Sequence, residues 1–137
     1  MGIDEELYKI AEDDLRGALE DMKWNGWRKS IISSCEAGEK YLKSALNTIP
    51  HDEQMNTTHS LTWLYAAISH VHNGTPDLEK AVKVLSKYVV TARYAIPGMV
   101  WTEDMAKDFI KYAQLVRDYV NSIRKEVKIY ISGGVEE

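Results

Sequence analysis

The stretch "TARYAIPGMVW" sets Arg93 and Tyr94 side by side just before a turn. An arginine guanidinium can donate paired hydrogen bonds to a phosphate, and a tyrosine ring can stack on a base. Pro97 and Gly98 account for a turn without any function, and Arg93 could simply bond the last carbonyls of a helix. Residue types alone therefore leave the pair open as either a binding site or a helix end.

Histidine and cysteine residues offer little for metal binding or nucleophilic chemistry. His70 and His72 lie two positions apart, and on a helix such side chains diverge by roughly 200°, so they do not converge on one ion. Cys35 falls at an apolar helical position, which predicts a small buried side chain rather than a reactive thiolate. The sequence has no glycine-rich phosphate loop and no hydrolase elbow. We therefore expect no metal site and no cofactor.

The predicted surface is charged but not strongly basic. Lys80, Lys83 and Lys87 recur three and four residues apart, which predicts a basic stripe that is more often solvated than bound to phosphate. The net charge of −4 argues against duplex DNA as a ligand. Among the four tryptophans, Trp101 is the one that we expect to be exposed.

Apolar residues that recur every three or four positions predict five helices. These helices span residues 7–22, 27–49, 61–71, 78–92 and 105–127. Asn73 and Gly74 favour a left-handed helix end, Thr75 is a predicted N-cap, and Thr102 precedes the last helix. Because no segment alternates like a strand, we predict an all-α fold, an antiparallel up-and-down bundle of about five helices. Residues 1–137 are expected to form one domain.

Composition also indicates where the protein acts. A single cysteine cannot form an intramolecular disulfide, and the N-terminus lacks the basic and apolar segments of a signal peptide. The longest stretch without Asp, Glu, Lys or Arg is residues 54–76. It contains three histidines and is too polar to span a membrane. We therefore expect a cytoplasmic protein without membrane contact.

Three short motifs, met in order along the chain, resemble those of the HEPN family, the higher eukaryotes and prokaryotes nucleotide-binding domains. Residues 37–46, Ala-Gly-Glu-Lys-Tyr-Leu-Lys-Ser-Ala-Leu, are similar to the family pattern Ala-Glu-Lys-x-x-Lys-Ala. Residues 58–61, Thr-His-Ser-Leu, resemble its Thr-His-x-Leu. Arg93 and Tyr94 resemble the Arg-Tyr-Pro that ends its fourth helix, and an acidic start with an alanine follows on the last helix (Glu103, Asp104 and Ala106).

This resemblance implies a helical bundle that forms a homodimer and pairs with a small nucleotidyltransferase, as in toxin–antitoxin systems. Some members of the family are metal-independent ribonucleases, whose signature is an arginine followed, after four to six residues, by a histidine. The polar positions that match the family motifs are implied to bind a nucleotide or an RNA end: Lys40, Lys43, His59, Arg93 and Tyr94.

The chain departs from the ribonuclease signature, because Gly98, Met99 and Val100 occupy the positions where the histidine would fall. Without an acid or base beside the arginine, a ribose 2′-hydroxyl would not be activated. The leading hypothesis is therefore a binding protein rather than an enzyme. Two alternatives stay open: a metal-independent ribonuclease in which His59 replaces the missing histidine, and a structural dimeric bundle whose site has decayed.

Overall fold

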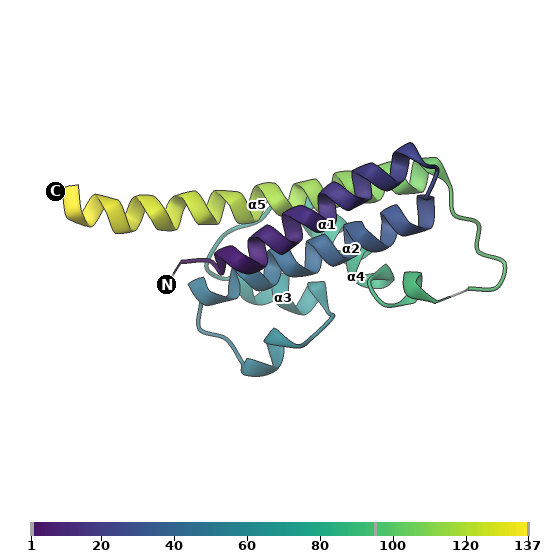
Figure 1. The fold of residues 1–137 in the computed structure, drawn as a ribbon. Helices are drawn as coiled ribbons and strands as arrows, with labels where there is room; N and C mark the ends of the chain where they lie inside the picture. Colours follow the sequence, from purple (N-terminus) through teal and green to yellow (C-terminus); the bar gives the residue numbers. More distant parts are fainter. Residues whose placement is uncertain (1, 95, 137) are drawn as a thin grey trace.

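The computed structural model describes residues 2–94 and 96–136, and the regular elements in these ranges are all helical. Their α-helices are, in chain order, α1 Glu5–Lys23, α2 Trp27–Ser44, α3 Leu61–Ser69, α4 Pro76–Tyr88 and α5 Glu103–Glu136 (Figure 1). Short 3-10 helices lie in the connections: η1 Leu46–Thr48, η2 Glu53–Asn56 and η3 Thr91–Arg93. The predicted all-α bundle of about five helices is confirmed.

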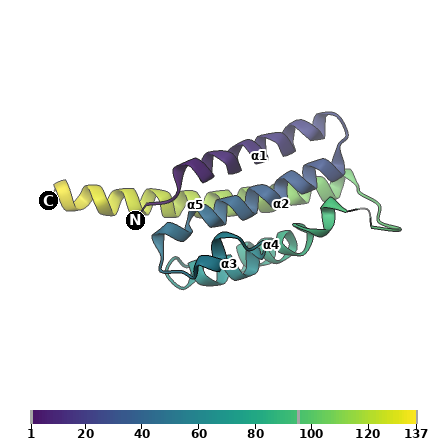
Figure 2. The same ribbon diagram turned by 60° about the horizontal axis from the view of Figure 1, so that its bottom comes forward.

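The central helix of the bundle is α2. It packs along α1 and α5, and α3 and α4 cover another of its sides (Figure 2). More than half of its residues are buried: Ser30, Ile31, Ser34, Cys35, Ala37, Gly38, Glu39, Tyr41, Leu42 and Ser44. Among these, Ile31, Tyr41 and Leu42 are large apolar side chains, and each contributes about 1.5–3 kcal/mol when it is buried.

Small residues on α2 let its neighbours approach closely. Ser30 Oγ donates a hydrogen bond of 2.9 Å to the carbonyl of Ala18 in α1. A Cβ added at Gly38 would lie 3.0 Å from a methyl of Leu85 in α4 and 3.2 Å from one of Leu61 in α3. The close packing of α4 against α2 brings η3, which follows α4, beside α2 as well.

Side-chain caps begin four of the described α-helices. Asp4 caps α1, Ser60 caps α3, and Thr75 caps α4 as the sequence predicts. Thr102 Oγ1 accepts a hydrogen bond of 3.2 Å from the N–H of Met105 and so caps α5. The start of α2 is different, because its N-cap is Gly26, which has no side chain to accept such a bond.

Three helices end earlier than the apolar spacing predicts, and one of them, α3, ends two residues early at Ser69. α2 ends at Ser44 and α4 at Tyr88, and a 3-10 turn follows each after one or two residues. Leu46 and Ala92 in these turns are fully buried. The apolar pattern therefore continues beyond the α-helix, because a 3-10 turn also directs its side chains into the core.

The predicted left-handed helix end at Asn73 and Gly74 is wrong. Within the described ranges, positive φ angles occur at Asn25 (57°) and Gly98 (77°). Gly74 is required for space instead, because a Cβ at this position would lie 1.8 Å from the hydroxyl of Tyr65. The side chain that excludes larger residues comes from α3, which local sequence rules do not consider.

The expectation that Trp101 is the exposed tryptophan is also wrong. Its ring is partly buried and meets Tyr88 edge to face, with 6.4 Å between the ring centroids. Trp24, the C-cap of α1, is 79% exposed instead. Trp101 is partly buried because its ring packs against Tyr88 at the end of α4.

Candidate nucleotide-binding site

One face of α2 carries a row of four charged residues. Glu36, Glu39, Lys40 and Lys43 follow one another at spacings of three, one and three, which place their side chains on the same side of the helix. Lys40 Nζ lies 4.0 Å from Glu36 Oε2, and Lys43 Nζ lies 3.0 Å from Glu39 Oε2. We call these four residues the α2 charged row.

Arg93 reaches the α2 charged row from the end of η3. Its Nη2 atom lies 3.6 Å from Glu36 Oε2. The alternative role, bonding the last carbonyls of α4, falls to another residue, because Thr91 Oγ1 donates to the carbonyl of Lys87 at 3.1 Å. Arg93 therefore joins η3 to α2 and leaves part of its side chain accessible to solvent.

His59 reaches the same row from the loop before α3. Its Nδ1 atom lies 2.8 Å from Glu39 Oε1, and the side chain of Glu39 is only 9% exposed. Ser60, not His59, caps α3, because Ser60 Oγ accepts a hydrogen bond of 3.2 Å from the N–H of Trp63. His59 is thus held by a buried carboxylate while half of its side chain faces solvent.

Lys40 links the row to α1. Its Nζ atom donates a hydrogen bond of 2.5 Å to Asp14 Oδ2. The same atom makes a longer contact of 4.0 Å with Glu36 Oε2. The lysine side chain is only about a quarter exposed, so it is more than a solvated surface group. Lys40 and Arg93 share one carboxylate, Glu36, which keeps two cations on the same side of α2.

The structure therefore brings four of the five predicted site residues to one helix face, in two groups. Lys40 and Arg93 surround Glu36, whereas Lys43 and His59 contact Glu39. When His59 is protonated, four cationic side chains contact three carboxylates. The cations are Lys40, Lys43, His59 and Arg93, and the carboxylates are Asp14, Glu36 and Glu39. An anionic ligand can bind here only by sharing or displacing these carboxylates, since the positive charge is already largely neutralised.

The fifth predicted residue, Tyr94, follows Arg93 in an extended conformation and is 65% exposed. An exposed tyrosine ring is suited to stacking on a base. The loop beyond it turns at Gly98, whose φ of 77° favours glycine. Gly98, one of the three positions where the family resemblance would place a histidine, is therefore used here to make the turn.

The contact between His59 and Glu39 has a chemical consequence. When Nδ1 carries a proton and donates it to the carboxylate, Nε2 holds a lone pair that can accept a proton. The buried carboxylate fixes the orientation of the imidazole ring, as a carboxylate does when it accepts a hydrogen bond from a metal-binding or catalytic histidine. Lys43 donates a hydrogen bond of 3.0 Å to the same carboxylate and so compensates the negative charge of Glu39.

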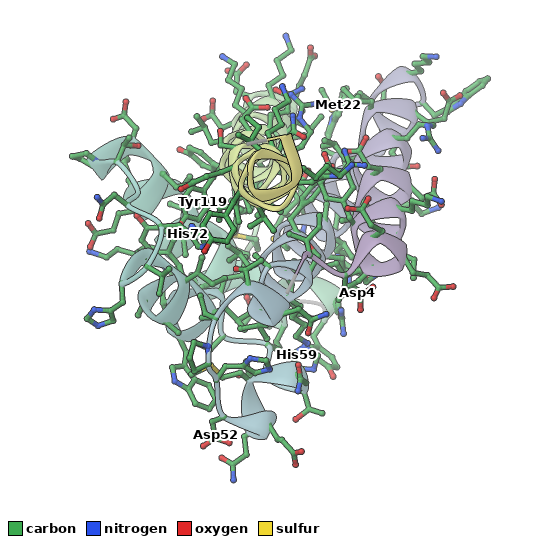
Figure 3. The ribbon with its side chains drawn as sticks, turned by 90° about the vertical axis from the view of Figure 1, so that its left-hand side faces the viewer. Asp4, Met22, Asp52, His59, His72 and Tyr119 are labelled. Atoms are coloured by element: carbon green, nitrogen blue, oxygen red, sulfur yellow. The ribbon has the colours of Figure 1, made fainter. Side chains whose placement is uncertain are left out.

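The remaining candidates lie outside this face. Cys35 is fully buried, as predicted, and burial raises the pKa of its thiol far above the usual range. His72 Nε2 lies 3.1 Å from Thr48 Oγ1, and Figure 3 shows His72 with Tyr119 beside α5, away from His59. In the part of the chain that the structure describes, no three metal-ligand side chains gather to hold an ion. No described helix has the length and apolar character needed to cross a membrane.

The carboxylates are the residues that sequence reasoning missed. Glu36 with Lys40, and Glu39 with Lys43, are acid–base pairs four residues apart, and this spacing could have revealed them. Nothing local could reveal that Glu39 is buried or that His59 bonds to it, because these two residues meet only through the packing of α2 against the loop before α3.

Comparison with known protein families identifies the family of the chain. The HEPN domain family matches residues 5–123, which cover most of the chain. The chain therefore belongs to the HEPN domain family. No protein of curated function matches it.

Two solved structures share the fold. The crystal structure of TT1696 from Thermus thermophilus superposes with a TM-score of 0.75 at 24% identity, over 86% of this chain and 95% of that one. The crystal structure of ST0689, an archaeal HEPN homologue, has a TM-score of 0.70 at 23% identity, over 89% of this chain and 98% of that one. At these identities the likeness establishes the fold alone.

Proposed function

We propose that this HEPN-domain protein binds a nucleotide or an RNA end on the α2 charged row, with Arg93 and Tyr94 as principal contacts. One observation carries the proposal: Arg93 and His59 come from different connections yet reach carboxylates one helical turn apart on the same face of α2. Charged side chains that converge in this way on one face, with an exposed tyrosine directly after Arg93 in the chain, suit a ligand that has both phosphate and base.

The contacts suggest how the ligand would be held. A phosphate near Glu36 would meet the guanidinium of Arg93 and the ammonium of Lys40, which already share that carboxylate. A base beyond it could stack on Tyr94, which precedes the turn of the loop. Arg93 is suited to this role because its guanidinium can hold Glu36 and a phosphate oxygen at once.

Calorimetric titration of the purified protein with ATP and with GTP tests the binding site. Arg93→Ala should weaken binding, whereas Arg16→Ala, which removes an exposed arginine paired with Asp13 on α1, should leave it unchanged. Absence of any heat with either nucleotide, together with absence of binding to a labelled RNA end, would refute the proposal. If Arg93→Ala lowers the melting temperature without a ligand response, the structural bundle with a decayed site is favoured.

The same proposal includes a partner. Family membership supports a homodimer and a pairing with a small nucleotidyltransferase, in a toxin–antitoxin-like arrangement within the cytoplasm. Light scattering of the purified protein should report twice the mass of one chain. Co-expression with the nucleotidyltransferase of a neighbouring gene should yield a complex that survives gel filtration, and separate elution of the two proteins would argue against the pairing.

A second candidate function is a metal-independent ribonuclease, and the contact between His59 and Glu39 favours it. Glu39 orients the ring, Nε2 can take the proton of a ribose 2′-hydroxyl, and Arg93 can stabilise the charge that develops on phosphate. Cleavage of RNA should then persist in EDTA and disappear in both His59→Ala and Arg93→Ala. Activity that survives in either variant would exclude this mechanism.

A further inference from the structure

A second feature lies at the end of the bundle where α1 turns into α2. A cavity of about 580 Å³ is lined there by Asp21, Trp24, Asn25, Gly26, Trp27, Arg28, Lys29 and Trp101. Figure 1 shows this turn beside the start of α5, so segments that are distant in the sequence bound the cavity. Its volume is within the range of ordinary small-ligand sites.

Three of the four tryptophans of the chain line this cavity. Trp101 forms a fixed wall, because its ring packs against Tyr88. Trp27 is partly buried against the core, whereas Trp24 stands at the mouth with most of its surface exposed. Two indoles that line one cavity, one partly buried and one exposed, offer flat surfaces on which a planar ring can bind.

The charges around the cavity suit an anion. Arg28 and Lys29 outnumber Asp21, so the lining carries net positive charge. The Nε atom of Arg28 is buried and has no hydrogen-bond partner among the described residues. A buried donor without a partner is uncommon, and it sets Arg28 apart from the paired cations of the α2 charged row.

The backbone adds further donors at the same place. Helix α2 begins at Trp27 with neither a side-chain cap nor an acidic residue in its first turn. Its first N–H groups therefore remain free to donate to a phosphate, and the helix dipole favours negative charge there. The positive lining excludes the cationic ligands that aromatic cages otherwise select.

We propose that this cavity binds one nucleotide of a single-stranded nucleic acid. The base stacks on Trp24 against the wall of Trp101, and the phosphate bonds to Arg28 and to the start of α2. The site is separate from the α2 charged row: Arg28 precedes Glu36 by two helical turns, roughly 12 Å along the axis. One strand could therefore contact both places, and the two sites can be tested independently.

Fluorescence anisotropy with a short fluorescein-labelled oligouridylate tests the proposal on the full chain. Trp24→Ala should weaken binding roughly 5- to 150-fold, the range for loss of one stacked base. Trp24 and Lys29 are both exposed, so changing them leaves the core intact, and Lys29→Glu serves as the second variant that should weaken binding. Trp63→Ala, which removes a partly exposed tryptophan from α3, is the matched control and should bind like the wild type.

Three outcomes would overturn the inference: no binding of the oligouridylate to the wild type, wild-type affinity in both Trp24→Ala and Lys29→Glu, or an equal loss in Trp63→Ala. The Arg93→Ala variant separates this site from the α2 charged row. If ATP and GTP do not bind but the oligouridylate still binds through Trp24, the result supports the cavity site and refutes the proposed site on α2. If binding of the oligouridylate depends on Arg93 and not on Trp24, the result supports the site on α2 and refutes the cavity site.

Discussion

Arg93 and Glu36 connect the end of η3 to the middle of α2, with 3.6 Å between guanidinium and carboxylate. The same carboxylate lies 4.0 Å from Lys40, so two cations converge on one acidic group. This arrangement resembles a phosphate site in which a carboxylate occupies the place of the anion. Ligand affinity should then depend on Glu36 as much as on the cations.

Glu36→Gln should strengthen nucleotide binding. Removing the negative charge frees Arg93 and Lys40 for a phosphate, and because the pair is partly exposed we expect a gain of only roughly 2- to 5-fold. Calorimetric titration with ATP measures it. Glu103→Gln, which removes an exposed carboxylate paired with Lys107 at 2.9 Å, is the control and should leave affinity unchanged. Weaker binding in Glu36→Gln would show that the carboxylate supports the site.

Glu39→Gln should destabilise the fold. The carboxylate is nearly buried and bonds to both Lys43 and His59, so the change leaves a partly buried ammonium without its counter-charge. We expect a loss of about 1–3 kcal/mol in the free energy of unfolding, measured by urea denaturation. The Glu103→Gln variant should stay within about 0.5 kcal/mol of the wild type. Equal stability of the two variants would contradict the burial of Glu39.

Glu5 should make stability depend on acid pH. Arg124 donates hydrogen bonds to both oxygens of Glu5 at 2.8–3.1 Å and lowers the pKa of that carboxyl below its ordinary value of 4.5. The pair therefore stabilises the fold above the unfolded pKa, and this contribution is lost as pH falls through the lowered pKa. Both side chains are partly exposed, so the contribution is below about 1 kcal/mol.

Melting curves of Glu5→Gln and of the wild type, recorded from neutral to acid pH, check this dependence. The variant should melt at a lower temperature at pH 7, and the difference should shrink on acidification. Glu6→Gln, at an exposed neighbouring position, should show no such difference at pH 7. A difference between Glu5→Gln and wild type that grows on acidification would reverse the sign and exclude the explanation.

Gly74→Ala should destabilise the protein, although Gly74 lies in a loop. The new methyl group would meet the hydroxyl of Tyr65, whose ring is held edge to face against Tyr119 with 5.7 Å between centroids. Such overpacking costs typically about 1–3 kcal/mol. Gly17→Ala is the matched control, because nothing lies within 4 Å of its Cβ position in α1. It should raise stability by about 0.5–1 kcal/mol, and thermal melting distinguishes the two changes.

Local signals in the sequence predicted most of the fold. The apolar spacing located the five helices, and Thr75 caps α4 as its type and its following proline indicate. These signals succeed because a helix face and an N-cap depend on residues within a few positions of each other. They fail at Gly74 and Trp101, where the decisive neighbours are Tyr65 and Tyr88 from other helices.

The candidate site, like the fold, could be predicted from the sequence only in part. The sequence by itself determined the all-α fold and, through its three motifs, the HEPN family and the residues worth testing. Only the tertiary structure decided that Arg93 and His59 reach the same face of α2, and that Glu36 and Glu39 already neutralise them. The physical reason is that charge pairing depends on distances of a few ångströms across packed helices, which the spacing of residues along one helix does not specify.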